Sequence, residues 1–203
     1  MSDERIVVLS VLGLVGLLAL IAVGIYNRLV RSSERTKEAW SGIDVQLRRR
    51  ASLIPNLVET VQGYATHERG VFEEVARARS ALEQARGVGE STEANRSLTD
   101  ALGRLFAVVE RYPELKASSN FQELQDALAD IEEKIAYARQ FYNRNVADFN
   151  IRIQRVPDIM VARMLRLERV EFFDAEEDGR AEPGVRFSRS IEIPPEGTPS
   201  ARK

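Results

Sequence analysis

The 203-residue sequence contains no cysteine, a single histidine and few aromatic residues. Without cysteine the chain can form no disulfide, thiolate metal site or thiol nucleophile, and it has no residue to carry a lipoprotein-type anchor. Aromatic residues make up 7% and charged residues 30% of the chain, which favours a solvated helical protein over a sandwich or barrel. The 29 basic and 31 acidic residues nearly balance, so the charge indicates no nucleic acid partner.

The sequence also lacks the common catalytic and cofactor-binding motifs. His67 has no partner at metal-ligand spacing, and its context HERG differs from the HExxH motif of zinc enzymes. There is no nucleophile elbow, no P-loop and no GxGxxG sequence. We therefore predict no catalytic, cofactor-binding or metal-binding residue, no cofactor, and a protein that is not an enzyme.

One uncharged stretch of 20 residues, Ile6 to Ile25, lies near the amino terminus. As a helix rising 1.5 Å per residue it is about 30 Å long, which matches the hydrocarbon core of a bilayer. The alternative is a cleaved signal peptide with residues 22–24 as its cleavage site. The run is longer than the roughly 7–15 apolar residues of a signal peptide, and the preceding MSDER is not basic. We predict an uncleaved transmembrane helix over residues 6–26 that contacts the lipid bilayer.

Charge is distributed unequally on the two sides of this stretch. The preceding residues contain one arginine and two acids, whereas Arg28, Arg31, Arg35 and Lys37 follow it closely. Because positively charged flanks are retained in the cytoplasm, we expect residues 1–5 to form a short extracytoplasmic N-terminus and the remainder to be cytoplasmic.

Beyond the span, apolar residues recur at alternating steps of three and four, the spacing of one helix face. The pattern predicts a first helix that runs through Pro55 to a glycine-containing turn near Arg86. We expect this helix to be continuous but kinked, since Pro55 lacks the N–H that would bond the carbonyl of Ala51. Its inward face comprises Trp40, Ile43, Leu47, Ile54, Leu57, Val61, Tyr64, Val71 and Val75.

Two further long helices and one short helix are predicted after this turn. The second helix begins at about Thr92 and stops before Pro113. The third has a regular apolar seam from Phe121 to Ile153, with Pro157 ending it. A short amphipathic helix then starts at Asp158.

Such helices can bury their apolar faces only against one another, and short connections force neighbours to run antiparallel. The predicted fold class is all-α: an N-terminal single transmembrane helix followed by an elongated antiparallel helical bundle. This bundle has three long helices plus a short C-terminal helix and spans residues 27–173. Residues 174–203 lose apolar density and gain proline, glycine and acids, which predicts a disordered tail.

Candidate interaction residues cluster around Pro55, and they are Arg48, Arg49, Pro55, Asn56 and Glu59. The polar residues among them could form a groove for a peptide or a partner helix. Alternatively, they satisfy the backbone groups that the proline leaves free.

The basic run from Arg48 to Arg50 has two interpretations as well. Arg50 falls on the apolar seam, where ion pairing with an acid of the third helix is expected. The acids that we consider are Glu123, Asp126 and Glu133. The alternative is a contact with anionic lipid or a partner, which the distance from the membrane disfavours.

Three stretches of the chain resemble the LemA family. They are YNRLVRSSERTKEAWSGIDVQLRRRASLIPNLVETVQGYATHE, then YPELKASSNFQELQDALADIEEKIAYARQFYNRNVADFN, and RVPDIMVARM. The resemblance covers about Tyr26 to Phe173 and implies a bacterial inner-membrane protein with a helical-bundle domain, a short outer N-terminus and a cytoplasmic remainder. No catalytic residues carry over from it. The motif residues are Trp40, Asp44, Arg49, Ile54, Pro55, Asn56, Leu57, Val58, Glu59, Tyr64, Tyr112, Pro113, Tyr142 and Asn143.

Taken together, these features predict a single-pass membrane protein whose cytoplasmic bundle acts as a protein-interaction or scaffold module. The sequence does not identify its protein partner, and a second copy of the chain, forming a homo-oligomer, is one of the candidates. The alternative hypothesis is an enzyme, or a regulator of a membrane protease, with a polar site around Asn56 and Glu59. A catalytic site would require these residues to line a cavity, whereas a scaffold requires an exposed surface.

Overall fold

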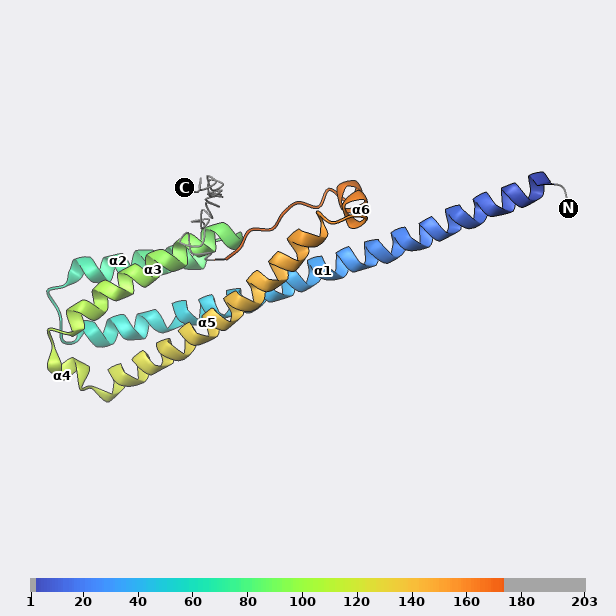
Figure 1. The fold of residues 1–203 in the computed structure, drawn as a ribbon. Coiled ribbons are helices and arrows are strands. Elements are labelled where there is room, and N and C mark those ends of the chain that lie inside the picture. Colours follow the sequence, from blue (N-terminus) through green and yellow to red (C-terminus); the bar gives the residue numbers. More distant parts are fainter. Residues whose placement is uncertain (1–2, 174–203) are drawn as a thin grey trace, which may run out of the picture.

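The computed structural model describes residues 3–173, and the first two residues and the predicted tail over 174–203 lie outside this range. No strand occurs within the described range, which confirms the all-α class. Figure 1 shows the six helices, which are α1 (Asp3–Gln62), α2 (Arg69–Gln84), α3 (Gly87–Val109), α4 (Pro113–Lys116), α5 (Ser119–Arg152) and α6 (Asp158–Met164).

Helix α1 is one continuous element of 60 residues, about 90 Å long at 1.5 Å per residue. Its amino-terminal part projects beyond the rest of the protein (Figure 1). The apolar side chains there are exposed, and the segment is long and apolar enough to cross a membrane. Ile25, the last residue of the uncharged run, is also the first buried residue of α1.

The remaining helices pack around the second part of α1. Helix α5 returns along α1 in the opposite direction, and α2 and α3 form a hairpin that covers α1 at the end far from the apolar segment (Figure 1). The main core joins apolar residues of all these helices, among them Ile43, Ile54, Leu57, Val75, Leu98, Leu105, Phe121 and Ile131. Most positions of the predicted seams are therefore buried.

The prediction of one helix from Trp40 to the turn near Arg86 was wrong. Helix α1 ends at Gln62, and the chain turns through residues 63–68 before α2 begins at Arg69. The turn lets α2 fold back on α1 and bury Phe72, whereas a straight helix would leave that apolar face without a partner. Tyr64, predicted to face inward, lies in this turn and is 46% exposed. The apolar spacing resumes in step after the turn, and the interruption at Glu68 was not recognised as a break.

The start of the second predicted helix and the role of Pro113 also differ from the prediction. Helix α3 starts at Gly87, before the expected Thr92, and Pro113 begins the additional short helix α4. The last helix is only seven residues long and ends at Met164. After it come a turn at residues 165–166 and a segment without regular secondary structure that is bonded to α5 as far as Phe173, and we call residues 165–173 the strap.

Candidate interaction surface

The five residues predicted from the sequence lie on the exposed side of α1. Arg48, Arg49, Pro55, Asn56 and Glu59 are all exposed, and Arg48 forms an ion pair with Asp44 one turn away at 3.0 Å. The grooves described below are lined by other parts of the chain. Asn56 and Glu59 therefore lie on an exposed face of α1.

Pro55 has a structural role that the contacts make clear. Helix α1 continues through it, as predicted, and the carbonyl of Ala51 cannot receive the usual bond from residue 55. Nε of Arg79 on α2 donates a hydrogen bond to this carbonyl at 3.1 Å, while its Nη2 pairs with Glu83 at 2.8 Å. The freed acceptor is thus used to attach α2 to α1, and the residue that satisfies it, Arg79, lies outside the polar cluster to which the sequence interpretation gave this role.

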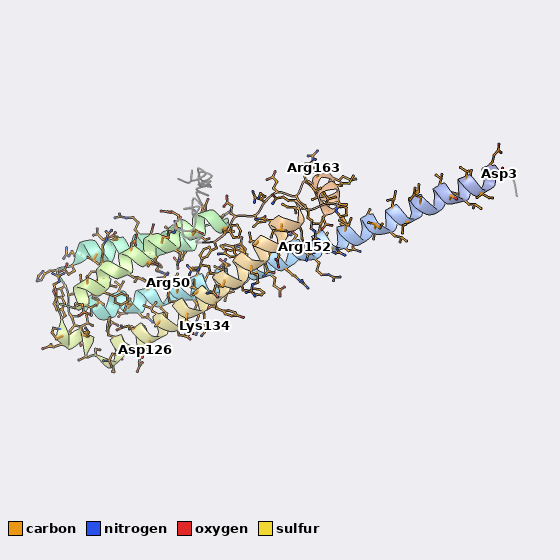
Figure 2. The ribbon with its side chains drawn as sticks, in the orientation of Figure 1. Asp3, Arg50, Asp126, Lys134, Arg152 and Arg163 are labelled. Atoms are coloured by element: carbon orange, nitrogen blue, oxygen red, sulfur yellow. The ribbon has the colours of Figure 1, made fainter. Side chains whose placement is uncertain are left out.

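Arg50 is buried between α1, α3 and α5, with 5% of its surface exposed (Figure 2). Its Nη1 donates to Oδ1 of Asn95 at 2.6 Å and its Nη2 to Oγ1 of Thr99 at 3.1 Å. Nη2 also pairs with Glu132 on α5 at 3.3 Å. The expected ion pair with the third long helix is confirmed, although the acid differs from the three considered. Burial lowers the pKa of the Arg50 guanidinium, and the charge of Glu132 opposes that shift.

A groove of about 430 Å³ lies beside Arg50, between α3 and α5. Its apolar walls include Leu102, Phe106 and Leu128, and Arg50 and Glu132 form its polar part. The Arg50 guanidinium is already bonded to both helices. We therefore interpret this groove as part of the contact between α3 and α5, which Arg50 bridges.

A larger groove of about 830 Å³ follows α1 and α5, and we call it the Tyr137 groove. Its lining comprises Glu38, Ala39, Gly42, Gln46, Asp130, Glu133, Lys134, Tyr137, Ala138 and Phe141. Tyr137 is 73% exposed and Phe141 51% exposed, although both are large aromatic residues. Oε1 of Gln46 is buried and has no hydrogen-bond partner within residues 3–173.

The strap is held to α5 by side chains that bond its backbone. Asn150 accepts a hydrogen bond from N–H of Val170 and donates one to its carbonyl, both at 2.9 Å. Asn143 makes the same pair of bonds with Phe173, both at 3.0 Å. Each amide thereby satisfies backbone groups of the strap that have no partner in a helix or sheet.

Aromatic residues complete the attachment of the strap. The Tyr142 hydroxyl donates to the carbonyl of Glu171 at 2.9 Å. Phe173 is fully buried, with its ring 5.7 Å from that of Trp40, which in turn lies 5.6 Å from the ring of Tyr142. Burial, and then the negative charge of Glu171, raise the pKa of Tyr142 to about 12.

The sequence interpretation missed the strap and the α5 side chains that hydrogen-bond its backbone. Asn143 was recognised only as a motif residue, and Asn150 was not noticed. A signal was present, because two asparagines seven residues apart share one face of a helix that is otherwise apolar there. Within residues 3–173, no group of three His, Asp or Glu side chains is placed to hold a metal ion.

Comparison with known proteins identifies the family. A family model described as the LemA family matches residues 39–187. The chain belongs to the LemA family. Two magnetosome proteins of Paramagnetospirillum magneticum, MamQ 1 and MamQ 2, are each 30% identical over 202 residues, covering 87% of this chain and 74% of theirs. Protein LemA of Metamycoplasma hominis is 27% identical over 169 residues, covering 83% of this chain and 77% of its own length.

Proposed function

We propose that this LemA-family protein is a single-pass membrane scaffold that binds a helix of a partner protein in the Tyr137 groove. One observation carries the proposal: two large aromatic side chains, Tyr137 and Phe141, stand exposed along a groove of about 830 Å³ between α1 and α5. Exposed aromatic residues at the centre of a groove are the usual anchors of protein interfaces.

The dimensions of the groove suit a helix. It follows α5 from Asp130 to Phe141, about 16 Å at 1.5 Å per residue, or about three helical turns. Its floor contains Ala39, Gly42 and Ala138, and the open space above Gly42 allows close approach of another backbone. An amphipathic helix laid into an apolar groove is a recurrent mode of recognition.

The charges at the rim favour a basic partner. Glu38, Asp130 and Glu133 line the groove together with one cation, Lys134, which pairs with Asp130 at 2.6 Å. Glu38 and Glu133 therefore leave the rim negative. A partner helix with Lys or Arg flanking its apolar face would complement it.

The proposal is tested by photo-crosslinking of the full-length protein in its native membrane. A photoreactive amino acid replaces Phe141 in one variant and Ala76, exposed on α2, in the control. We expect a discrete adduct from position 141 only, which Tyr137→Ala abolishes without changing the helix content. Equal labelling at both positions would contradict the proposal, and an adduct with a second copy of the chain would make the protein a homo-oligomer.

The proposed orientation has its own test. The charge asymmetry about residues 6–25 favours an outer N-terminus and a cytoplasmic helical domain. A reporter that is active only outside the membrane, fused after Lys203, should be silent. A strong signal would reverse the orientation and leave the groove proposal intact.

The alternative of an enzyme or protease regulator with its site at Asn56 and Glu59 has less support, since both side chains are exposed. The names of the relatives also fit a scaffold better than one fixed reaction. Some are magnetosome proteins, whereas another is a LemA protein of a mycoplasma. A binding module can serve different processes by changing its partner.

A further inference from the structure

The corner between α5 and α6 lies at the level where α1 leaves the bundle. Ala162 of α6 and Ile153, just after α5, pack against Ile25 and Leu29 of α1 in a second small core. Ile25 ends the uncharged run that would cross the membrane. If that run spans a bilayer, the α5–α6 corner must therefore lie at the bilayer surface.

The same corner exposes apolar side chains. Val156 is 75% exposed, Met160 68% and Met164 85%. Met160 and Met164 are one turn apart on α6, while Asp158 and Ala162 on the other face are buried. Large apolar residues that are grouped on one surface mark a contact with a partner or a membrane. Their position beside the end of the span favours the membrane, because this surface continues the one that already contacts lipid.

The charges of the corner complement anionic lipid. A cavity of about 510 Å³ is lined by Arg28, Asp148, Ile151, Arg152, Arg155, Val156, Pro157 and Asp158. Three arginines thus face two acids, and Asp158 is only 6% exposed. Within residues 3–173 none of these arginines forms an ion pair. Figure 2 shows Arg152 at this corner and Arg163 on α6 nearby.

We propose that the α5–α6 corner is a second membrane contact that inserts Val156, Met160 and Met164 and binds anionic phospholipid headgroups through Arg28, Arg152 and Arg155. The guanidinium group of an arginine forms bidentate hydrogen bonds with phosphate oxygens, and the aliphatic part of the side chain covers apolar surface. The contact fixes the angle at which the long α1–α5 pair leaves the membrane. It rests on the proposed membrane anchoring of α1 but not on the Tyr137 groove.

The test uses the absence of cysteine in the full-length chain. Single cysteines replace Met160 in the corner, Ala19 in the span and Ala76 on α2, and each carries a spin label. The labelled proteins are reconstituted in phosphatidylcholine vesicles with or without phosphatidylglycerol. Collision of the label with oxygen, which dissolves in lipid, is compared with collision with a nickel complex, which stays in water.

We expect the label at position 160 to collide several-fold more with oxygen, relative to nickel, than the label at Ala76, and more strongly with phosphatidylglycerol present. Arg152→Gln with Arg155→Gln should remove the phosphatidylglycerol effect, whereas lysine at both positions should retain part of it. The label at Ala19 should report lipid in every sample. Unchanged helix content in each variant separates a lost contact from misfolding.

Each contrary result has a distinct meaning. A water-exposed label at position 160 with a lipid-exposed label at Ala19 overturns the second contact and leaves the anchor. A water-exposed label at Ala19 overturns the anchoring itself. A label at position 160 that is shielded from both reagents places protein on the corner, and insertion that is equal in both lipids overturns the headgroup binding.

Discussion

The α1–α5 pair is covered in two different ways along its length. Far from the apolar segment, the α2–α3 hairpin covers α1 through apolar contacts and through Arg50, a buried cation that bonds α3. Close to that segment, the strap lies on α5, held by hydrogen bonds from Asn143 and Asn150 to its backbone. The distal half therefore depends mainly on area buried between helices, whereas the proximal half combines a smaller apolar core with directional bonds to the strap.

This difference predicts unequal responses to mutation. Buried apolar area is spread over many side chains, so removing one of them creates a cavity that the neighbours refill only in part. A directional bond is either made or lost, and a lost partner leaves a backbone group without its bond. Four experiments, from the largest expected effect to the smallest, test the contrast.

The largest effect is expected in the distal core. Leu98→Ala truncates a fully buried side chain of α3 and should lower the free energy of unfolding by about 2–5 kcal/mol. Denaturant unfolding of the full-length protein in detergent, followed by far-UV circular dichroism, measures this. Leu20→Ala, at an exposed position in the apolar segment, is the matched control, and an equal loss there would contradict the core assignment.

The strap should respond to a polar substitution. Asn150→Ala removes both bonds to Val170 and should cost about 1–3 kcal/mol locally. Trp40 is the only tryptophan and contacts Phe173, so its emission should shift to longer wavelength while the helical signal stays nearly constant. Asn145→Ala is the control on the same helix, because the side-chain amide of Asn145 donates to the Phe141 carbonyl within α5 and does not bond the strap. Parallel loss of both signals would show that the strap and bundle unfold as one unit.

Arg79 should stabilise the protein because Pro55 leaves the Ala51 carbonyl without its helical hydrogen bond. Arg79→Met removes the bond to the Ala51 carbonyl and should cost about 1 kcal/mol. In a Pro55→Ala background the new N–H of residue 55 can bond that carbonyl, so the same substitution should cost less. A double-mutant cycle measures the coupling. Additive effects would disprove the compensation between the two residues.

The smallest effect is a pH dependence of the proximal half. The pKa of Tyr142 is raised from 10.0 to about 12, so the unfolded chain loses this proton first as the pH rises. The stabilisation of the folded state by the protonated Tyr142 hydroxyl is fully present below pH 10 and is lost between pH 10 and 12. The difference in unfolding free energy between the wild type and Tyr142→Phe should shrink over that window. A constant difference would mean that the hydroxyl is not protected by burial.

The distal half was largely predictable from the sequence, because helical periodicity is local. Ile43, Ile54 and Leu57 recur at helix spacing and are buried, and the seam position of Arg50 correctly indicated a pair with α5. The identity of its partner, Glu132, depends on the relative rotation of two helices, which no periodicity specifies. The break at residues 63–68 was missed because the apolar residues on its two sides, Val61 and Val71, still lie at a spacing that one continuous helix face would have.

The proximal half was much less predictable. The strap has no periodicity of its own, and its bonds join Asn143 to Phe173 across 30 residues. The interaction residues predicted around Pro55 were chosen for local polarity, whereas the Tyr137 groove arises where α1 and α5 meet. Exposure of Tyr137 cannot be derived from its spacing, since it depends on which face of α5 is turned to α1.

The sequence by itself determined the apolar span, the helical class and the faces that form the main core, since each follows from residues within a few turns of one another. Only the tertiary structure decided where α1 ends, what covers α5, and which residues meet in grooves. The physical reason is that these features depend on contacts between segments far apart in the chain. Pro55 illustrates both levels, because its missing N–H is visible in the sequence, whereas the arginine that bonds the freed carbonyl comes from the helix folded back beside it.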